Sequence, residues 1–179
     1  EQVHPRFINF LLDEINNERT GENLEREVLR GAIKILIELG FGNNNVYKKD
    51  FEKIFLDKSQ EFYNNEAMEK ITTHSTGDYL KVVQKRLDEE QERCLDFLIE
   101  ETKKPLLKRI LSPMVENHCK ALINKPDSGL AYLIRQKQYS TIQLMFKIFT
   151  QVPTARKMFE NFLVDTVTDD CSNITRDTS

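Results

Sequence analysis

The stretch Val46–Leu98, VYKKDFEKIFLDKSQEFYNNEAMEKITTHSTGDYLKVVQKRLDEEQERCLDFL, decides the fold of this chain. Apolar residues recur at helical spacing in both of its halves. They are Phe51, Ile54, Phe55, Phe62 and Met68 in the first half, and Tyr79, Leu80, Val83, Leu87, Cys94, Leu95 and Leu98 in the second. Between the halves lie the turn and N-cap formers 72–77, TTHSTG. The pattern predicts two long amphipathic helices joined by a sharp corner.

Composition narrows the class of protein. Charged residues are 31% and hydrophobic residues 39% of 179, so the chain can bury a core and stay in solution. Glycine (6) and proline (5) are scarce and tryptophan is absent, which favours an all-α chain over a sheet protein. The net charge of −3 does not favour nucleic-acid binding, and no apolar run reaches the roughly 18 residues that a membrane span needs. We therefore expect no nucleic-acid and no membrane partner.

The three cysteines indicate a cellular compartment. Cys94, Cys119 and Cys171 are far apart and odd in number, which predicts neither a disulfide framework nor a metal site. No signal peptide is recognisable. We expect reduced thiols in a cytoplasmic and/or nuclear protein. Because the chain begins with Glu1, we also expect a fragment of something longer.

Two shorter helices are expected before the long pair. Residues 4–18 form the first, with Pro5 in its first turn and Thr20-Gly21 at its end, and Leu24–Leu39 forms the second, stopped by the Gly/Asn-rich loop 40–45. Their predicted apolar stripes are Phe7, Phe10, Leu11 and Ile15 in the first, and Leu24, Val28, Ile33, Leu36 and Leu39 in the second.

More helices are expected after the pair. A corner at Thr102–Pro105 should lead into a helix that runs to about Ile123 and that Pro113 kinks or restarts. Helices follow at Leu130–Gln136, Ser140–Phe149 and Thr154–Val164. From Thr166 the residues are polar and small, which predicts a frayed or disordered tail over 166–179.

A weak internal repeat is present. Five apolar positions of the second helix recur 109 positions later, and each set follows a short apolar helix. The sets are Ile33, Ile35, Leu36, Ile37 and Leu39, and Ile142, Leu144, Met145, Phe146 and Ile148. Two buried helices can match this well by chance, but a repeat of this length would describe a helical stalk and not a globule.

The sequence contains no recognisable active-site motif. None of the common metal, phosphate, dinucleotide or nucleophile motifs occurs, and His4, His74 and His118 lack partners at ligand spacing. His118 and Cys119 are adjacent, and adjacent helical residues point about 100° apart, so they predict no nucleophile and base pair. We predict no catalytic, cofactor-binding or metal-binding residue and no cofactor.

Four further features have ordinary explanations. The charged run from Lys85 to Arg93 predicts a solvent-exposed helix face with ion pairs between its side chains, and not a cation-binding site. The basic cluster of 103–104 and 108–109 reads as a solvated helix end. The aromatic residues Phe51, Phe55, Phe62 and Tyr63 could form a partner groove, but this spacing is more typical of a core. Asn173-Ile174-Thr175 fits the glycosylation pattern and should be unused without a secretory signal.

Longer motifs resemble the N-terminal region of the cullin family. The matching segments run in the family's order over about Phe7 to Leu163, and Asp127–Leu130 with Ser140–Pro153 look most like the branch that recruits BTB-domain adaptors. The segments are L-L-D-E-I-x-x-E-R-T-G-E (Leu11–Glu22), V-Y-x-x-D-F-E-x-x-F-L-x-x-S-x-E-F-Y (Val46–Tyr63), D-Y-L-K-x-V-x-x-R-L-x-E-E-x-x-R (Asp78–Arg93), T-x-x-P-L (Thr102–Leu106), His118, S-G-L (Ser128–Leu130) and M-F-K-I-F-T-Q-V-P (Met145–Pro153).

The resemblance implies an elongated, α-solenoid-like stack of helical bundles called cullin repeats. It divides the chain into a short helix pair (1–45), the long-helix core of a repeat (46–124), the start of the next repeat (125–165) and the tail. Cullins are scaffolds of ubiquitin ligases, so it implies BTB-domain adaptors and a RING subunit as partners, through parts of the full protein mostly absent here. It also implies a packing role for core residues, namely Phe51, Phe55, Leu56, Phe62, Tyr79, Leu80 and Leu87.

Two functions are therefore open. The first is a non-catalytic stalk segment of a cullin-RING ubiquitin ligase that holds the adaptor and the catalytic module apart. The alternative is a truncated, stand-alone cullin-like protein that acts as an interaction module or competitor without ligase activity. A helical membrane-tethering rod would share the architecture and lacks these motifs.

Overall fold

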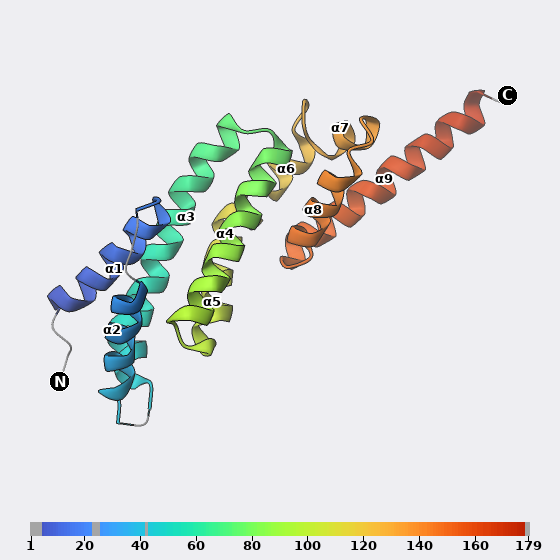
Figure 1. Ribbon diagram of the computed structural model, residues 1–179. Helices are drawn as coiled ribbons and strands as arrows, with labels where there is room; N and C mark the ends of the chain where they lie inside the picture. The colour runs from blue at the N-terminus through green and yellow to red at the C-terminus, as the bar shows by residue number, and fades with distance from the viewer. Residues whose placement is uncertain (1–4, 23–25, 42, 178–179) are drawn as a thin grey trace. The chain divides into compact units, whose positions relative to one another are not determined.

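The computed structural model describes residues 5–22, 26–41 and 43–177, with side chains up to 166 (Figure 1). Within these residues every regular element is helical and no strand occurs, which confirms the all-α prediction. The longer helices are α1 (Pro5–Arg19), α2 (Arg26–Glu38), α3 (Lys53–Thr73), α4 (Thr76–Asp96), α5 (Glu100–Met114), α8 (Tyr139–Phe149) and α9 (Pro153–Asp177). The shorter ones are a π-helical segment η1 (Tyr47–Glu52), a 3₁₀ turn η2 (Glu116–His118), α6 (Cys119–Asn124) and α7 (Leu130–Arg135).

The chain forms two compact units, each discontinuous in sequence. The first unit consists of Glu1–Phe62 and Leu87–Arg109, and the second of Tyr63–Arg86 and Ile110–Ser179. The first contains α1, α2, η1 and parts of α3, α4 and α5. The second contains the remaining parts of these three helices with α6, α7, α8 and α9.

The helices of the first unit end where the sequence predicts. The amide of Gly21 donates to the carbonyl of Glu18 and that of Glu22 to Asn17, which closes α1 with Gly21 in the left-handed region at φ 98°. Gly40 follows α2, where a Cβ would lie 1.9 Å from the carbonyl oxygen of Asn43. Leu24, assigned to the predicted stripe of this helix, lies outside the described residues.

Aromatic side chains from η1 and α3 form much of the first core. The amide of Lys53 donates to the carbonyl of Lys48, five positions earlier, so η1 is wound more widely than an α-helix. The ring centroids of Tyr47 and Phe51 are 5.3 Å apart, and those of Phe51 and Phe55 are 5.4 Å apart. All three rings are buried. At Phe51 and Phe55 the aromatic residues therefore belong to the buried core, as their spacing predicted.

The second unit is built around the corner between α3 and α4. Ser75 precedes α4, and its hydroxyl accepts the amide hydrogen of Asp78 at 3.1 Å, as an N-cap does. The corner lies within the segment that the sequence predicted. In the same unit, α6 contacts α7 and α9, and α8 contacts both α7 and α9.

The two prolines of α5 lie in different parts of the helix. The corner lies at 97–99, and α5 begins at Glu100 and runs through Pro105, so the corner predicted at Thr102–Pro105 is wrong. Pro113 is the penultimate residue of α5, and the predicted helix to about Ile123 is interrupted just after it, where η2 and α6 follow. The Tyr79 hydroxyl donates to the Met114 carbonyl at 2.7 Å, which satisfies an acceptor at the helix end.

The last helix is longer than expected. We predicted a helix over Thr154–Val164 and a disordered tail, whereas α9 continues to Asp177. No glycine follows Gly129 and no proline follows Pro153, so nothing in this stretch stops a helix outright. Thr178 and Ser179 lie outside the described residues.

The predicted core is largely confirmed. Phe51, Phe55, Tyr79, Leu80 and Leu87 are buried, whereas Leu56 and Phe62 are half-buried. Some stripe residues are exposed, because helical spacing places them at the edge of the buried face. They are Phe10, Val28, Leu39, Ile54, Met68 and Leu95.

Candidate functional site

The side chains with catalytic potential do not converge in the described residues. His74 accompanies the α3–α4 corner, and His118 ends η2, where burial lowers its pKa. Cys119 is buried, and its thiol contacts the Glu116 carbonyl at 3.2 Å and the Met158 sulfur at 3.4 Å. Among the described residues, no group of three or more His, Cys, Asp or Glu could hold a metal ion. His4 and the side chains of Cys171 and 173–175 lie outside the described part.

The Cys94 thiol is also buried and unreactive. It lies buried in the first unit, and loss of hydration, reinforced by the Glu90 carboxylate, raises the pKa of its thiol to about 12. The thiol is therefore protonated at neutral pH and is a poor nucleophile.

The first unit instead contains a buried polar cluster, which we call the Arg19 network. The Arg19 Nε donates to Glu90 Oε1 at 2.8 Å, and its Nη2 donates to the Ser59 hydroxyl at 2.8 Å. Arg93 donates from Nη1 to the same Glu90 oxygen at 2.6 Å, and from Nε to Glu18 Oε2 at 2.9 Å. These residues come from α1, α3 and α4, so the network joins three helices.

The network is extended at its edge by α2. Arg26 Nε donates to Glu18 Oε1 at 2.8 Å, and Arg26 Nη1 lies 3.5 Å from Asp96. Arg30 also donates to the Asp96 carboxylate, and this bond raises the pKa of Arg30. Charged groups thereby connect α1, α2 and α4, and the Ser59 hydroxyl adds α3.

Burial distinguishes the network from ordinary surface ion pairs. The exposed fraction of the side chain is 3% for Arg19, 0% for Glu90 and 3% for Arg93. The Arg19 guanidinium carbon lies 5.4 Å from the Phe55 ring centroid and 5.5 Å from that of Phe62. Removing one partner from such a cluster leaves an uncompensated charge in an apolar setting, which costs about 3–5 kcal/mol.

The solvated-face interpretation of the charged run is wrong for Glu90 and Arg93. Both residues point into the first unit, because they lie three positions apart on the same face of α4 as Leu87 and Cys94. One sequence signal could have found them. Glu18, Arg19, Ser59, Glu90 and Arg93 all belong to the motifs that carry the cullin resemblance.

A second buried polar contact joins η1 to α5. The hydroxyls of Tyr47 and Thr102 lie 3.0 Å apart, and Thr102 also donates to Glu52 Oε1 at 2.6 Å. Burial raises the pKa of Tyr47, against the opposing effect of the Thr102 hydrogen bond. Arg109 reaches α3 further along, with Nη2 at 3.0 Å from Asp57. The basic cluster is thus partly paired.

The second unit has its own polar contacts at the α3–α4 corner, which we call the Lys125 clamp. Lys125 Nζ donates to the carbonyls of Ile71 and His74, at 3.0 and 2.7 Å, and so caps the end of α3. The Ser128 hydroxyl accepts the Thr76 amide hydrogen at 3.0 Å, and the Thr76 hydroxyl donates to the Leu122 carbonyl at 3.3 Å. The S-G-L motif is therefore part of the clamp.

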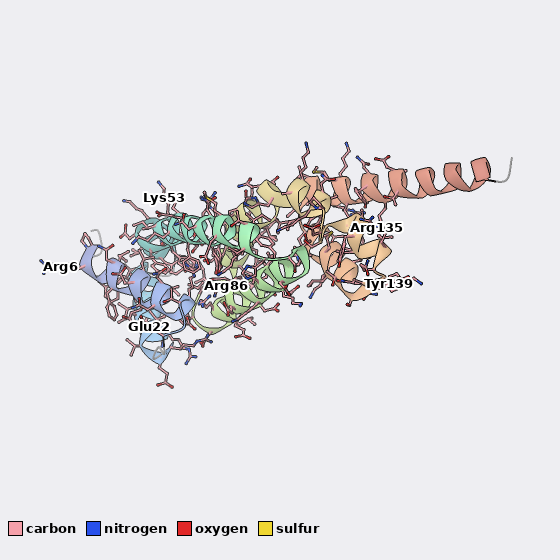
Figure 2. The ribbon with its side chains drawn as sticks, turned by 90° about the horizontal axis from the view of Figure 1, so that it is seen from above. Arg6, Glu22, Lys53, Arg86, Arg135 and Tyr139 are labelled. Atoms are coloured by element: carbon pink, nitrogen blue, oxygen red, sulfur yellow. The ribbon has the colours of Figure 1, made fainter. Side chains whose placement is uncertain are left out.

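Gly129 allows the clamp segment to fold back on itself. A Cβ at this position would lie 2.4 Å from the Ile123 carbonyl oxygen and 2.5 Å from that of Lys125. Both atoms belong to the backbone and cannot rotate away, so only glycine fits. Elsewhere in the unit, Arg86 (labelled in Figure 2) forms a bidentate pair with Glu66 through Nη2 and Nε, at 2.8 to 3.1 Å.

These features form packing sites and not a catalytic centre. The buried polar groups of each unit connect helices that are far apart in sequence, and none of the described groups is arranged as a nucleophile with a base. What the arrangement can do is fix which helices pack together and in which register.

The comparison with protein families agrees with the motifs. The model of the cullin alpha solenoid domain matches residues 1–179. The chain belongs to the cullin family. The resemblance expected from the sequence is confirmed, and so is its α-solenoid class.

Individual cullins show the same relationship. Over 151 residues, or 84% of this chain, it is 37% identical to Cullin-3A of Arabidopsis thaliana. Over 162 residues, or 90% of the chain, it is 30% identical to Cullin-3 of Dictyostelium discoideum. It is also 30% identical to mouse Cullin-4A over 84% of the chain. The two Cullin-3 relatives agree with the expected branch. The chain spans about a fifth of the length of each of these three relatives.

None of the helices described combines the length and the apolar character that crossing a membrane would need.

Proposed function

We propose that this cullin segment is a non-catalytic stalk element of a cullin-RING ubiquitin ligase. In that role it holds the substrate adaptor and the catalytic module at a fixed separation, in the cytoplasm or nucleus. The observation that carries the proposal is the match of the cullin alpha solenoid model to the whole chain. BTB-domain adaptors and a RING subunit would be its partners in the assembly, bound through other parts of the protein.

The buried polar residues support a mechanical role. A spacer must keep its helices in one packing arrangement, and the Arg19 network and the Lys125 clamp each tie segments more than forty positions apart. Apolar contacts alone are tolerant of register shifts, whereas a buried charge has few acceptable positions. The residues Glu18, Arg19, Ser59, Glu90 and Arg93 of the network lie within the cullin motifs, and of the clamp residues Ser128 does. We further propose that 46–124 form the core of one cullin repeat, preceded by the helix pair 1–45, and that 125–165 begin the next.

A chimera tests the proposal directly. The corresponding segment of a full-length Cullin-3 relative is replaced by this chain, and substrate ubiquitylation is measured with its adaptor and RING subunit. We expect activity to be retained. A chimera carrying a flexible Gly/Ser linker of similar span instead should bind both partners and lose most activity, because the separation is no longer fixed.

Two results would contradict the proposal. One is full activity of the Gly/Ser chimera, since a spacer without structure would then suffice. The other is binding of a BTB adaptor to the isolated chain at micromolar strength, with a compact scattering profile, which would favour an independent interaction module. The isolated chain should show an elongated profile and bind neither partner.

A further inference from the structure

The turn between α7 and α8 is an exposed segment that bears cations and an aromatic ring. Every residue from 135 to 140, RQKQYS, is exposed. Figure 2 labels Arg135 and Tyr139 on this segment, with side chains that project away from the ribbon. Along α8, Tyr139 (63% exposed) and Phe146 (46% exposed) share one face with Gln143, because they lie at i, i+4 and i+7.

The charge of this region differs from that of the chain. No acidic residue occurs from 128 to 159, whereas the whole chain carries a net charge of −3. The same stretch contains Arg135, Lys137, Lys147, Arg156 and Lys157. Arg156 pairs with Glu160 at 2.7 Å. Among the described residues no carboxylate pairs with Arg135, Lys137 or Lys147, so these three cations lack internal compensation.

The internal repeat shows a change of charge on this face. A shift of 109 positions relates Gln143 and Lys147 of α8 to Lys34 and Glu38 of α2. In α2 this lysine and this glutamate are exposed and lie 3.8 Å apart. The acidic residue of the first copy is thus the cation Lys147 in the second.

The backbone of this turn holds Lys137 in an unusual conformation. The amide of Gln138 donates to the carbonyl of Leu133 and that of Lys137 to Ile134, which is the same closing motif that ends α1. The left-handed position is Gly21 in α1, and it is Lys137, with φ 54°, after α7. A residue with a Cβ is less stable than glycine in this conformation, and the Lys137 side chain is exposed to solvent.

We propose that the hairpin face, formed by Arg135, Lys137, Tyr139, Gln143, Phe146 and Lys147, binds an acidic amphipathic segment of a partner protein. The uncompensated cations select acidic side chains, and the two aromatic rings accept apolar ones. Phe146 is already held by Phe159, with ring centroids 5.7 Å apart, so it is positioned before binding. Exposed aromatic residues beside cations are the composition of protein-binding hot spots. The inference does not depend on the stalk function.

A nucleic acid is a weaker match for the same face. The three uncompensated cations are few for a phosphate backbone, and the acidic chain as a whole repels a polyanion. Glutamine and aromatic side chains between the cations suit a mixed polar and apolar surface.

The test uses the whole chain and synthetic peptides of about 16 residues, long enough for two anchor pairs on one helical face. One peptide places Leu and Phe at i, i+3, i+4 and i+7 with Asp and Glu elsewhere, and its counterpart replaces each acid by lysine. We expect the acidic peptide alone to shift the amide resonances of 135–147, with affinity that falls as salt is added. The variant K137E/K147E should bind at least about tenfold more weakly, as charge reversal at an interface predicts.

Matched variants distinguish binding at the hairpin face from nonspecific electrostatic attraction between the chain and the peptide. Lys120→Glu changes an exposed cation of α6 in the same unit and should bind the acidic peptide as the unaltered chain does. Tyr139→Ala should weaken binding without changing the circular-dichroism spectrum, because the ring is exposed. Equal binding of both peptides, absence of shifts in 135–147, or stronger binding of a single-stranded RNA or of phosphatidylserine vesicles would each overturn the proposal.

Discussion

The side chain of Arg19, near the end of α1, donates to Glu90 of α4 across 71 positions of sequence, at 2.8 Å and without access to water. The same carboxylate oxygen accepts a second hydrogen bond, from Arg93. One acidic group thus compensates two buried guanidinium groups, and Glu18 supplies the second negative charge. The helix pair α1–α2 is fixed to the long helices by this arrangement.

Replacing Glu90 by glutamine should destabilise the first unit strongly. The amide keeps the shape but removes the negative charge that the buried Arg19 and Arg93 guanidinium groups share. We expect the free energy of unfolding to fall by about 3 kcal/mol. Urea denaturation measures it. Glu92→Gln, on the exposed side of α4, is the control and should change stability by less than about 0.5 kcal/mol. An equally small effect of Glu90→Gln would mean that the network is not buried in solution.

Replacing Lys125 by methionine should loosen the α3–α4 corner. The variant keeps the aliphatic part of the side chain and loses two hydrogen bonds to carbonyls at the end of α3. Because the ammonium is partly exposed, we expect a loss of about 1 kcal/mol. Amide hydrogen exchange of residues 71–76 should also accelerate. Lys120→Met serves as the matched control, and equal effects of the two substitutions would contradict the clamp.

The Cys94 thiol should resist modification in the native state. Its pKa of about 12 leaves almost no thiolate at neutral pH, and the side chain is buried. In a Cys119→Ser, Cys171→Ser background, the reaction with 5,5′-dithiobis(2-nitrobenzoate) should proceed only after denaturant is added. A rapid native reaction at pH 7 would show that the first unit opens readily.

His118 should make the second unit less stable in mild acid. Burial lowers its pKa in the folded chain below the ordinary value of about 6.5. The unfolded chain therefore binds more protons between the two values, and stability decreases as the pH falls below about 6.5. In His118→Gln this contribution disappears. The difference in unfolding free energy between the two proteins should thus change from pH 7 to pH 5 and stay constant above pH 7.

Two of the left-handed positions, Lys137 and Gly21, give a pair of opposite predictions. Lys137→Gly removes the unfavourable left-handed conformation of a residue with a Cβ and should raise the free energy of unfolding by about 1 kcal/mol. Gly21→Ala introduces that conformation and should lower it by about as much. Thermal denaturation measures both. If Lys137→Gly is neutral, the turn is not left-handed in solution.

Helical periodicity was sufficient to predict most of the fold. It placed the long helices, their corner and the helices near α7 and α8 within a few residues, because apolar spacing and turn formers agree there. It failed at the edges of the buried faces. Phe10 and Leu95 have the right spacing, yet lie half or more exposed, since a stripe on a helix does not show how far a neighbour covers it.

The buried charges were beyond the reach of single-sequence patterns. Glu90 and Arg93 stand in a run of charged residues, and composition assigns such a run to the solvent. Their burial depends on Arg19, whose position beside them is a property of the tertiary fold. The corner predicted at Thr102–Pro105 was also wrong: α5 already begins at Glu100, and its Thr102 contacts Tyr47, a residue distant in sequence. Only the family motifs contained these residues together.

The discontinuity of the first unit affects how the chain folds as it is synthesised. Residues 1–62 leave the ribosome without the segment 87–109 that completes their core and neutralises Arg19. During that interval Leu11, Ile15, Leu29 and Leu36 have no finished core, and the intervening residues 63–86 must be made before closure. We therefore expect nascent chains of this cullin segment to expose these apolar residues until the segment 87–109 has been made.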